Sequence, residues 1–218
     1  MSEEPADEFL EDRFERHSRG LEFDRVAFFS DAVFAIAMTL LVVGIGIPHV
    51  RDVKLVKSLG DKDAEIFSFF LSFVVIGFYW LGHHRFFATL QRVDRRFMQL
   101  NLLYLAAIAF MPFPTALVGS YGNLAVAVTL YAVTLATASA LEAVLLWWAH
   151  AQGFMRVRLT SDGFRWAMLA SVAPVVIFLA SIPVAYLVSA SWALYVWILI
   201  IPAEVLIDRL ERPDSITE

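Results

Sequence analysis

The sequence contains no cysteine among its 218 residues. Disulfide bonds, thiolate metal sites and cysteine nucleophiles are therefore excluded. Charge is also scarce, because only 18% of the residues are Asp, Glu, Lys or Arg, whereas 59% are hydrophobic. Soluble proteins do not have this composition, and the charged residues fall in blocks between long apolar runs. We therefore predict an all-α membrane protein that crosses the bilayer several times.

The N-terminal region lacks the pattern of a cleavable signal peptide. Its first fifteen residues are rich in Asp and Glu, and the first apolar run is too long for the hydrophobic core of a signal. We expect residues 1–24 to form a cytoplasmic tail and the apolar run to remain in the membrane. This acidic tail supplies much of the net charge of −5, so the net charge indicates no particular partner.

Long apolar runs, in contrast, fill most of the chain. A helix needs roughly 20 apolar residues to cross about 30 Å of hydrocarbon. Basic loops and breaks rich in Gly or Ser divide residues 25–208 into six predicted transmembrane helices. These predicted spans cover about residues 26–47, 65–83, 97–118, 124–149, 164–188 and 192–207. Residues 209–218 form the predicted cytoplasmic C-terminal tail.

The distribution of Lys and Arg predicts the orientation in the membrane. Of the 17 Lys and Arg residues, the only ones on the side opposite to the N-terminus are Arg51, Lys54, Lys57 and Lys62. Both termini are therefore expected in the cytoplasm. Since orientation already explains the basic residues, and no nucleic-acid motif is present, the expected surroundings are the lipid bilayer and not a nucleic acid.

The first predicted span carries a polar cluster at its entry, formed by Arg25, Ser30 and Asp31, and is otherwise apolar. A carboxylate at membrane depth costs a few kcal/mol unless it is paired or hydrated. An ion pair with Arg25 is the simplest arrangement, although the two residues are six positions apart and out of phase. The alternative partners lie at the same depth on spans two and three, and are Trp80, His83, His84 and Asn101.

The polar cluster and the apolar residues of this span point in different directions. Successive helical residues turn by about 100°, so Ile36, Leu40 and Val43 form one narrow apolar stripe with Thr39 on its flank. Ser30 and Asp31 point away from that stripe. The stripe either faces a symmetry axis where copies of the chain meet, or it faces lipid or the subunit core, and the angles alone leave both open.

Three segments resemble a known family. The first runs from Arg25 through Phe29-Ser30-Asp31 into Ala-Val-Phe-Ala-Ile-Ala-Met-Thr-Leu-Leu-Val. The others are Tyr79-Trp80-Leu81-Gly82-His83-His84-Arg85-Phe86 and Asn101-Leu102-Leu103-Tyr104-Leu105. Together they resemble the prokaryotic transmembrane protein 175 family, the relatives of the endolysosomal potassium channel. The resemblance is close over spans one to three, whereas spans four to six match only in number and character.

The resemblance implies a six-span subunit of a homotetramer in a prokaryotic cell membrane, with the first helices lining a potassium-permeable pore. By position, Ile36 matches the family's isoleucine constriction, and Leu40 and Val43 complete the hydrophobic wall. We expect this constriction to act as gate and moderate selectivity element, because an apolar ring offers an ion no oxygen ligands and can close by dewetting. Thr39 supplies a nearby hydroxyl. The family motif that ties helix one to helices two and three corresponds to Arg25, Phe29, Ser30, Asp31, Trp80, His83 and Asn101. No cofactor or metal is implied beyond permeating potassium and other monovalent cations.

One position departs from the family pattern, and one rival function stays open. Gly44 stands where family members often carry an acidic residue near the outer end. A proton-coupled secondary transporter would instead use Asp31, Glu142 and His83 as a relay. Glu142 and Glu204 are either protonated or hydrogen-bonded residues of the bundle, or proton- or ion-coupling sites, and the resemblance gives neither a role. An enzyme is not expected, because no His-Glu-x-x-His, Gly-x-Ser-x-Gly or paired-Asp constellation is present.

Overall fold

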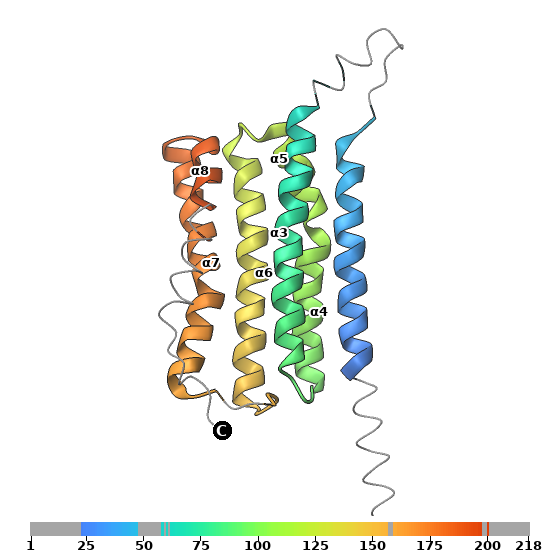
Figure 1. Cartoon of the computed structure of the whole chain (residues 1–218). Coiled ribbons are helices and arrows are strands. Elements are labelled where there is room, and N and C mark those ends of the chain that lie inside the picture. Colours follow the sequence, from blue (N-terminus) through green and yellow to red (C-terminus); the bar gives the residue numbers. More distant parts are fainter. Residues whose placement is uncertain are drawn as a thin grey trace, which may run out of the picture.

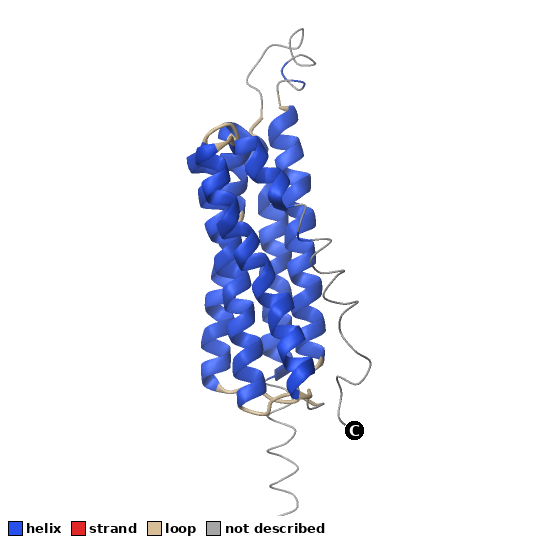
Figure 2. Cartoon of the chain, turned by 90° about the vertical axis from the view of Figure 1, so that its left-hand side faces the viewer, coloured by secondary structure: helices blue, strands red, loops and turns tan. Residues whose placement is uncertain are grey.

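The computed structural model describes residues 23–47, 58, 60, 62–156, 159–197 and 200, which form a bundle of helices (Figures 1 and 2). A first helix, Phe23–Ile45, ends in the 3-10 turn η1, Leu41–Ile45. It is followed by α3 (Asp63–Ala88), α4 (Arg95–Phe110), α5 (Pro112–Tyr121), α6 (Ala125–Ala151), α7 (Ser161–Leu187) and α8 (Ala190–Val196). The described residues hold no strand, only an isolated bridge between Leu90 and Met155. The predicted all-α class is confirmed.

Five of the described segments are long and apolar enough to cross a membrane: the first helix, α3, the combined Arg95–Tyr121 segment of α4 and α5, α6 and α7. The predicted sixth span, residues 192–207, begins within α8, but most of it lies outside the described residues. The same holds for most of the two predicted tails, 1–24 and 209–218. Six spans therefore stay a prediction.

Polar side chains mark where three of the helices begin. The carboxylate of Asp94 accepts a hydrogen bond from the backbone N–H of Phe97 at 2.6 Å and thereby caps α4. The hydroxyls of Thr160 and Ser189 cap α7 and α8 in the same way. The break between α4 and α5 falls before Pro112, because proline has no N–H to continue a helix but fits at its first position.

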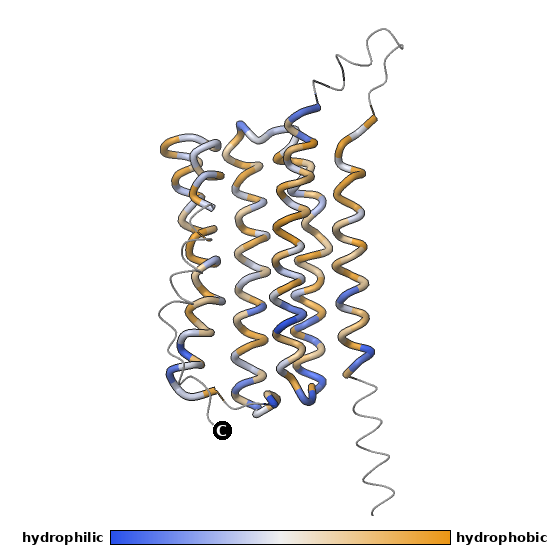
Figure 3. The backbone as a smooth tube through the Cα atoms, in the orientation of Figure 1, coloured by the Kyte–Doolittle hydropathy of each residue, from blue (hydrophilic) through white to orange (hydrophobic). Residues whose placement is uncertain are grey.

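Helix α6 lies at the centre of the bundle, with α4, α5, α7 and α8 packed against it. Many of its buried residues are alanines, whose small side chains let neighbouring helices approach closely. The first helix lies at the edge of the bundle beside α3 and α4, and η1 contacts α3 and α5 (Figure 1). Figure 3 shows apolar colour along most of the helices and hydrophilic positions near the lower ends of the first helix, α3 and α4.

The loops at one end of the bundle join its two halves. The loop after α3 pairs with the loop after α6 through the bridge between Leu90 and Met155. The backbone N–H of Arg156 donates to the carbonyl of Thr89 at 2.8 Å, and its guanidinium Nε donates to the carbonyl of Leu90 at 2.9 Å. The helices of the first half are therefore fastened to α6 and α7 at the end that the charge distribution assigns to the cytoplasm.

Candidate functional site: the two faces of the first helix

The first helix has one buried face, which packs into the bundle. Ser30 and Phe34 are fully buried, while Ala37 and Leu41 are 1% and 2% exposed. These residues are spaced by three or four positions, so they form a single stripe on the helix. The ring of Phe34 contacts the rings of His83 on α3 and Tyr104 on α4, with centroids 5.5 and 6.0 Å away.

The opposite face carries the predicted apolar stripe and is open in the single subunit. Ile36 is 57% exposed, Leu40 46% and Val43 73%. Thr39 is also exposed, and its hydroxyl donates to the backbone carbonyl of Ile36 at 2.8 Å, so this hydroxyl is held against its own helix. The stripe therefore lies on the subunit surface and not in the subunit core, which leaves lipid or further copies of the chain as its neighbours.

A buried chain of hydrogen bonds anchors the first helix to α3 and α4. The Asn101 amide nitrogen donates to the Ser30 hydroxyl at 2.9 Å, and the amide oxygen lies 2.9 Å from Nε2 of His83. All three side chains are at most 2% exposed. Because buried polar groups are costly without partners, this chain of bonds fixes both the rotation and the depth of the first helix.

Asp31 makes a separate contact between the first helix and α3. Its carboxylate accepts a hydrogen bond from the indole nitrogen of Trp80 at 2.8 Å. Among the described residues, Asp31 forms no ion pair with Arg25, so the interhelical alternative is the arrangement seen. Asp31 thus points toward α3, away from the Ile36 stripe.

His83 occupies the centre of an aromatic cluster. Its ring stacks on Tyr104 with an interplanar angle of 2° and on Phe87 with a centroid distance of 4.2 Å. Phe97, in the first turn of α4, also packs against Phe87, with ring centroids 5.7 Å apart. His83 is therefore enclosed by side chains of the same subunit, and its neighbour His84 is exposed, with its ring near Trp80.

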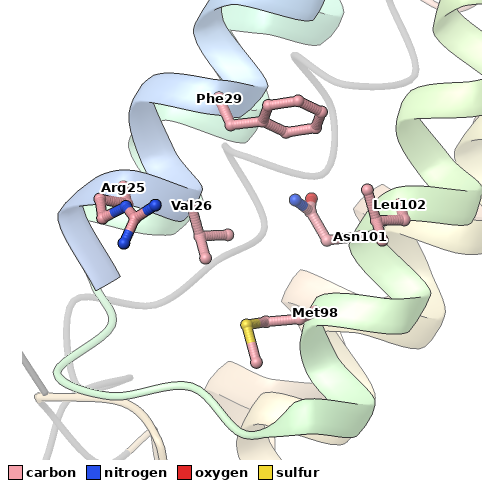
Figure 4. A pocket seen from close by; sticks show the side chains of 6 residues that line it. All are labelled: Arg25, Val26, Phe29, Met98, Asn101 and Leu102. Carbon is pink, nitrogen blue, oxygen red and sulfur yellow. The ribbon is translucent and has the colours of Figure 1, made fainter. Parts of the chain in front are cut away.

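Arg25 and Phe29 lie apart from this anchor. Arg25 is exposed, and Phe29 is 52% exposed. Figure 4 shows both side chains, together with Val26, beside a pocket of about 390 Å³ that Met98, Asn101 and Leu102 of α4 line from the other side. Of the residues predicted to tie the first helix to its neighbours, the structure brings Ser30, Asp31, Trp80, His83 and Asn101 together and leaves Arg25 and Phe29 at the surface.

The sequence interpretation did not find a second polar network further along the bundle. The Ser72 hydroxyl is 2.7 Å from the hydroxyl of Tyr131 on α6 and accepts a hydrogen bond from Thr115 at 2.9 Å. Tyr79 on α3 bonds Ser139 on α6. Ser72, Tyr79 and His83 are seven and four positions apart, so they share one face of α3, and this spacing was the available signal.

Two further acidic residues, Glu142 and Glu204, lie within the predicted spans. Glu142 lies on α6 close to α3, because a Cβ added to Gly82 would come within 3.2 Å of its carboxylate oxygen. Glu204 lies outside the described residues. Within the part of the chain that the structure describes, no group of three or more His, Asp or Glu side chains could hold a metal ion.

The fold and this site define a class: an all-helical integral membrane protein whose first helix is anchored by buried polar groups and presents an apolar face at the subunit edge. Residues 25–112 match the model of the family described as endosomal/lysosomal potassium channel TMEM175. This match covers the first helix, α3 and α4, which hold the anchor. The matched family is one of ion channels, so the resemblance drawn from the motifs is confirmed over residues 25–112.

Individual relatives agree with the family match. A potassium channel of Streptomyces collinus is 40% identical over 132 residues, which cover 58% of this chain and 64% of that protein. A potassium channel of Chamaesiphon minutus is 44% identical over 103 residues, or 46% of this chain and 51% of the relative. The endosomal/lysosomal proton channel TMEM175 of Homo sapiens is 35% identical over 101 residues, or 42% and 20% of the two chains. The matched segments thus span less than two thirds of these relatives.

Solved structures share the fold over more of the chain. The crystal structure of a lysosomal potassium-selective channel TMEM175 homolog from Chamaesiphon minutus superposes with a TM-score of 0.73 at 29% identity, covering 86% of this chain and 98% of that one. A variant of the potassium channel MtTMEM175, solved with a nanobody fusion, gives a TM-score of 0.64 at 20% identity, covering 85% of this chain and 92% of that one. At 20% identity, the similarity to MtTMEM175 shows a shared fold and nothing more.

Proposed function

We propose that the chain is the subunit of a potassium-permeable cation channel, assembled as a homotetramer whose first helices surround the pore. The observation that carries this proposal is the apolar stripe of Ile36, Leu40 and Val43, which is exposed on a helix held in place by buried polar bonds. A helix that were merely a lipid-facing span would need no such fixed rotation. The potassium channels among the relatives support the permeant ion.

In this proposal Ile36 is the gate and the main selectivity element. A ring of isoleucine side chains offers no oxygen ligands, so a passing ion keeps its water or sheds part of it without replacement. Potassium holds its water more weakly than sodium, and a narrow apolar ring therefore favours potassium moderately. The same ring closes by dewetting when its radius shrinks slightly. Leu40 and Val43 extend the apolar wall, and Thr39 is the nearby hydroxyl.

Planar-bilayer recording of the purified protein under a potassium/sodium gradient tests the proposal. We expect unitary currents with a reversal potential shifted toward that of potassium. Ile36→Asn should give a leakier and less selective pore, because an amide keeps the constriction wet. Val176→Asn is the matched control, since Val176 is 60% exposed on α7, far from the first helix in Figure 1. Equal conductance of Ile36→Asn and the unaltered protein would contradict the assignment of Ile36.

Asp31→Ala tests the anchor separately. This change removes the acceptor of the Trp80 N–H and should impair assembly or opening, while any remaining currents keep their selectivity. Native gel migration and bilayer recording measure the two effects. A changed selectivity in a fully assembled protein would contradict the anchoring role. Saturable, proton-coupled flux without unitary currents would instead favour the transporter built on Asp31, Glu142 and His83.

A further inference from the structure

The exposed stripe of the first helix does not end at Ile36. At about 100° per residue, Arg25 and Phe29 lie within roughly 20° of Ile36 around the helix axis. Phe29 is 52% exposed and Arg25 is exposed, whereas the next residue, Ser30, is fully buried. Arg25, Phe29, Ile36, Leu40 and Val43 therefore form one continuous exposed stripe that runs from the N-terminal end of the helix to its other end.

The guanidinium of Arg25 is open to its surroundings. Among the described residues, ion pairs join Lys62 to Glu65 and Arg165 to Asp162, and Arg25 takes part in neither. The pocket beside Arg25 in Figure 4 is lined by the apolar side chains of Val26, Phe29, Met98 and Leu102 and by the amide of Asn101. None of these residues neutralises a positive charge.

The nearby carboxylates point elsewhere. Asp24 is exposed but lies about 100° from Arg25 around the helix, and Asp31 is about 120° away and hydrogen-bonded to Trp80. On α4, Asp94 is engaged at the helix cap, where it accepts from Phe97 and Trp148. Within the part of the chain that the structure describes, no carboxylate pairs with Arg25, which places a positive charge at the N-terminal end of the stripe.

We infer that Arg25 lines the inner entrance of the pore and lowers the concentration of cations there, with Phe29 forming the next turn of the same wall. This inference rests on the proposed channel function. Four copies bring four guanidinium groups to one opening, where a shared charge changes the local concentration of permeant ions. Outward cation current, which is drawn from this entrance, is therefore smaller than inward current. The asymmetry decreases at high salt because the Debye length falls from about 10 Å at 0.1 M to 3 Å at 1 M.

The absence of cysteine from the chain allows a direct test. Arg25→Cys places a single thiol at the entrance, and charged methanethiosulfonates can then be added from the inner side during bilayer recording. We expect the Cys variant to raise the ratio of outward to inward current about twofold at low salt. A positively charged reagent should restore the original ratio, and a negatively charged reagent should raise it further. Arg25→Lys should keep the original ratio.

Two further variants make the result decisive. Arg165→Cys is the matched control, because Arg165 is an exposed arginine at the corresponding end of α7 and its modification should leave the current ratio unchanged. Phe29→Cys replaces Arg25→Cys if the latter does not assemble, and should respond to the sign of the reagent in the same direction. Currents that ignore the reagents at both positions overturn the inference while leaving the channel intact. No current from the unaltered protein overturns the proposed function itself, and the inference with it.

Discussion

The first helix and α6 are both apolar membrane helices, yet they occupy opposite places in the subunit. Over its most apolar 18 residues, the first helix has a mean hydropathy of 2.3, and 22% of these residues are buried. The corresponding 18 residues of α6 have a mean hydropathy of 1.6, and 56% of them are buried. The more hydrophobic helix is therefore the more exposed one. In a bilayer this order is physically reasonable, because lipid accepts large aliphatic side chains while close packing between helices requires small ones.

The comparison also separates two uses of polar side chains. On α6, Tyr131 and Ser139 bond to α3 and help to hold the centre of the bundle together. On the first helix, Ser30 and Asp31 fix a helix that lies at the edge of the bundle in Figure 1. A central helix is positioned from all sides, whereas an edge helix depends on a few directional bonds to set which face it exposes.

The largest loss of stability is expected when the anchor of the edge helix is removed. Asn101→Leu leaves Nε2 of His83 without its partner, at a cost of about 1–3 kcal/mol for an unsatisfied buried group. It also removes the donor to the Ser30 hydroxyl, which keeps its own bond to the Val26 carbonyl. Thermal unfolding in detergent measures the effect. Gln99→Leu on the exposed side of the same helix is the control and should leave the transition unchanged. Equal stability of the two variants would show that the anchor does not hold the edge helix.

Overpacking should distinguish the central helix from the edge helix. Ala138 on α6 is fully buried, and Ala138→Leu should destabilise the subunit by about 1–3 kcal/mol because the neighbouring helices cannot move apart freely. Ala35→Leu, on the exposed side of the first helix, should change the free energy of unfolding of the single subunit by less than about 0.5 kcal/mol. Denaturant titration of both variants tests the contrast, which fails if both lose the same stability.

The same pair of variants sharpens the comparison when assembly is measured. If other copies surround the first helix, Ala35→Leu should weaken the oligomer while sparing the subunit. Mass photometry over a dilution series detects such a change. A loss of oligomer with Ala138→Leu at unchanged subunit stability would place the subunit interface on α6 instead.

A smaller effect than that of Ala138→Leu is expected at the N-terminus of α4, beside the loop that fastens the two halves. Asp94→Ala removes the cap of α4 and the acceptor of the Trp148 N–H, at a cost of about 1 kcal/mol. Asp94→Asn should recover most of this loss, since an amide oxygen also accepts from the backbone of Phe97. Asp162→Ala, an exposed acid in the first turn of α7, serves as the control. Equal unfolding temperatures for Asp94→Ala and Asp162→Ala would argue against a capping role.

Several features of the site followed from local spacing. The 100° rotation per residue placed Ile36 and Ser30 on different faces of the first helix, and the exposures of 57% and 0% agree with that separation. The interhelical partners Trp80 and Asn101 were proposed from their depth along their own spans. Depth alone does not show which side chain on the first helix bonds to which partner. In the structure Trp80 donates to Asp31, and Asn101 donates to Ser30.

The same rotation places Arg25 and Phe29 on the exposed face of Ile36, although the family motif groups them with the buried anchor. Other features could not be predicted from spacing alone. The spacing of polar residues along α3 indicates a polar face, but it does not show that Ser72 bonds Thr115 on α5 and Tyr131 on α6. The central place of α6 likewise depends on how all the helices pack together.

The amino-acid sequence by itself determined that the chain lies in a membrane, where its helices run, and which residues of the first helix share a face. These properties depend on hydropathy and on the fixed rotation of an α-helix, which need no neighbour. Tertiary structure decided which helix is central, which polar groups pair, and that the stripe through Ile36 is left open at the subunit surface. Those properties depend on contacts between segments distant in sequence, and only folding brings such segments together.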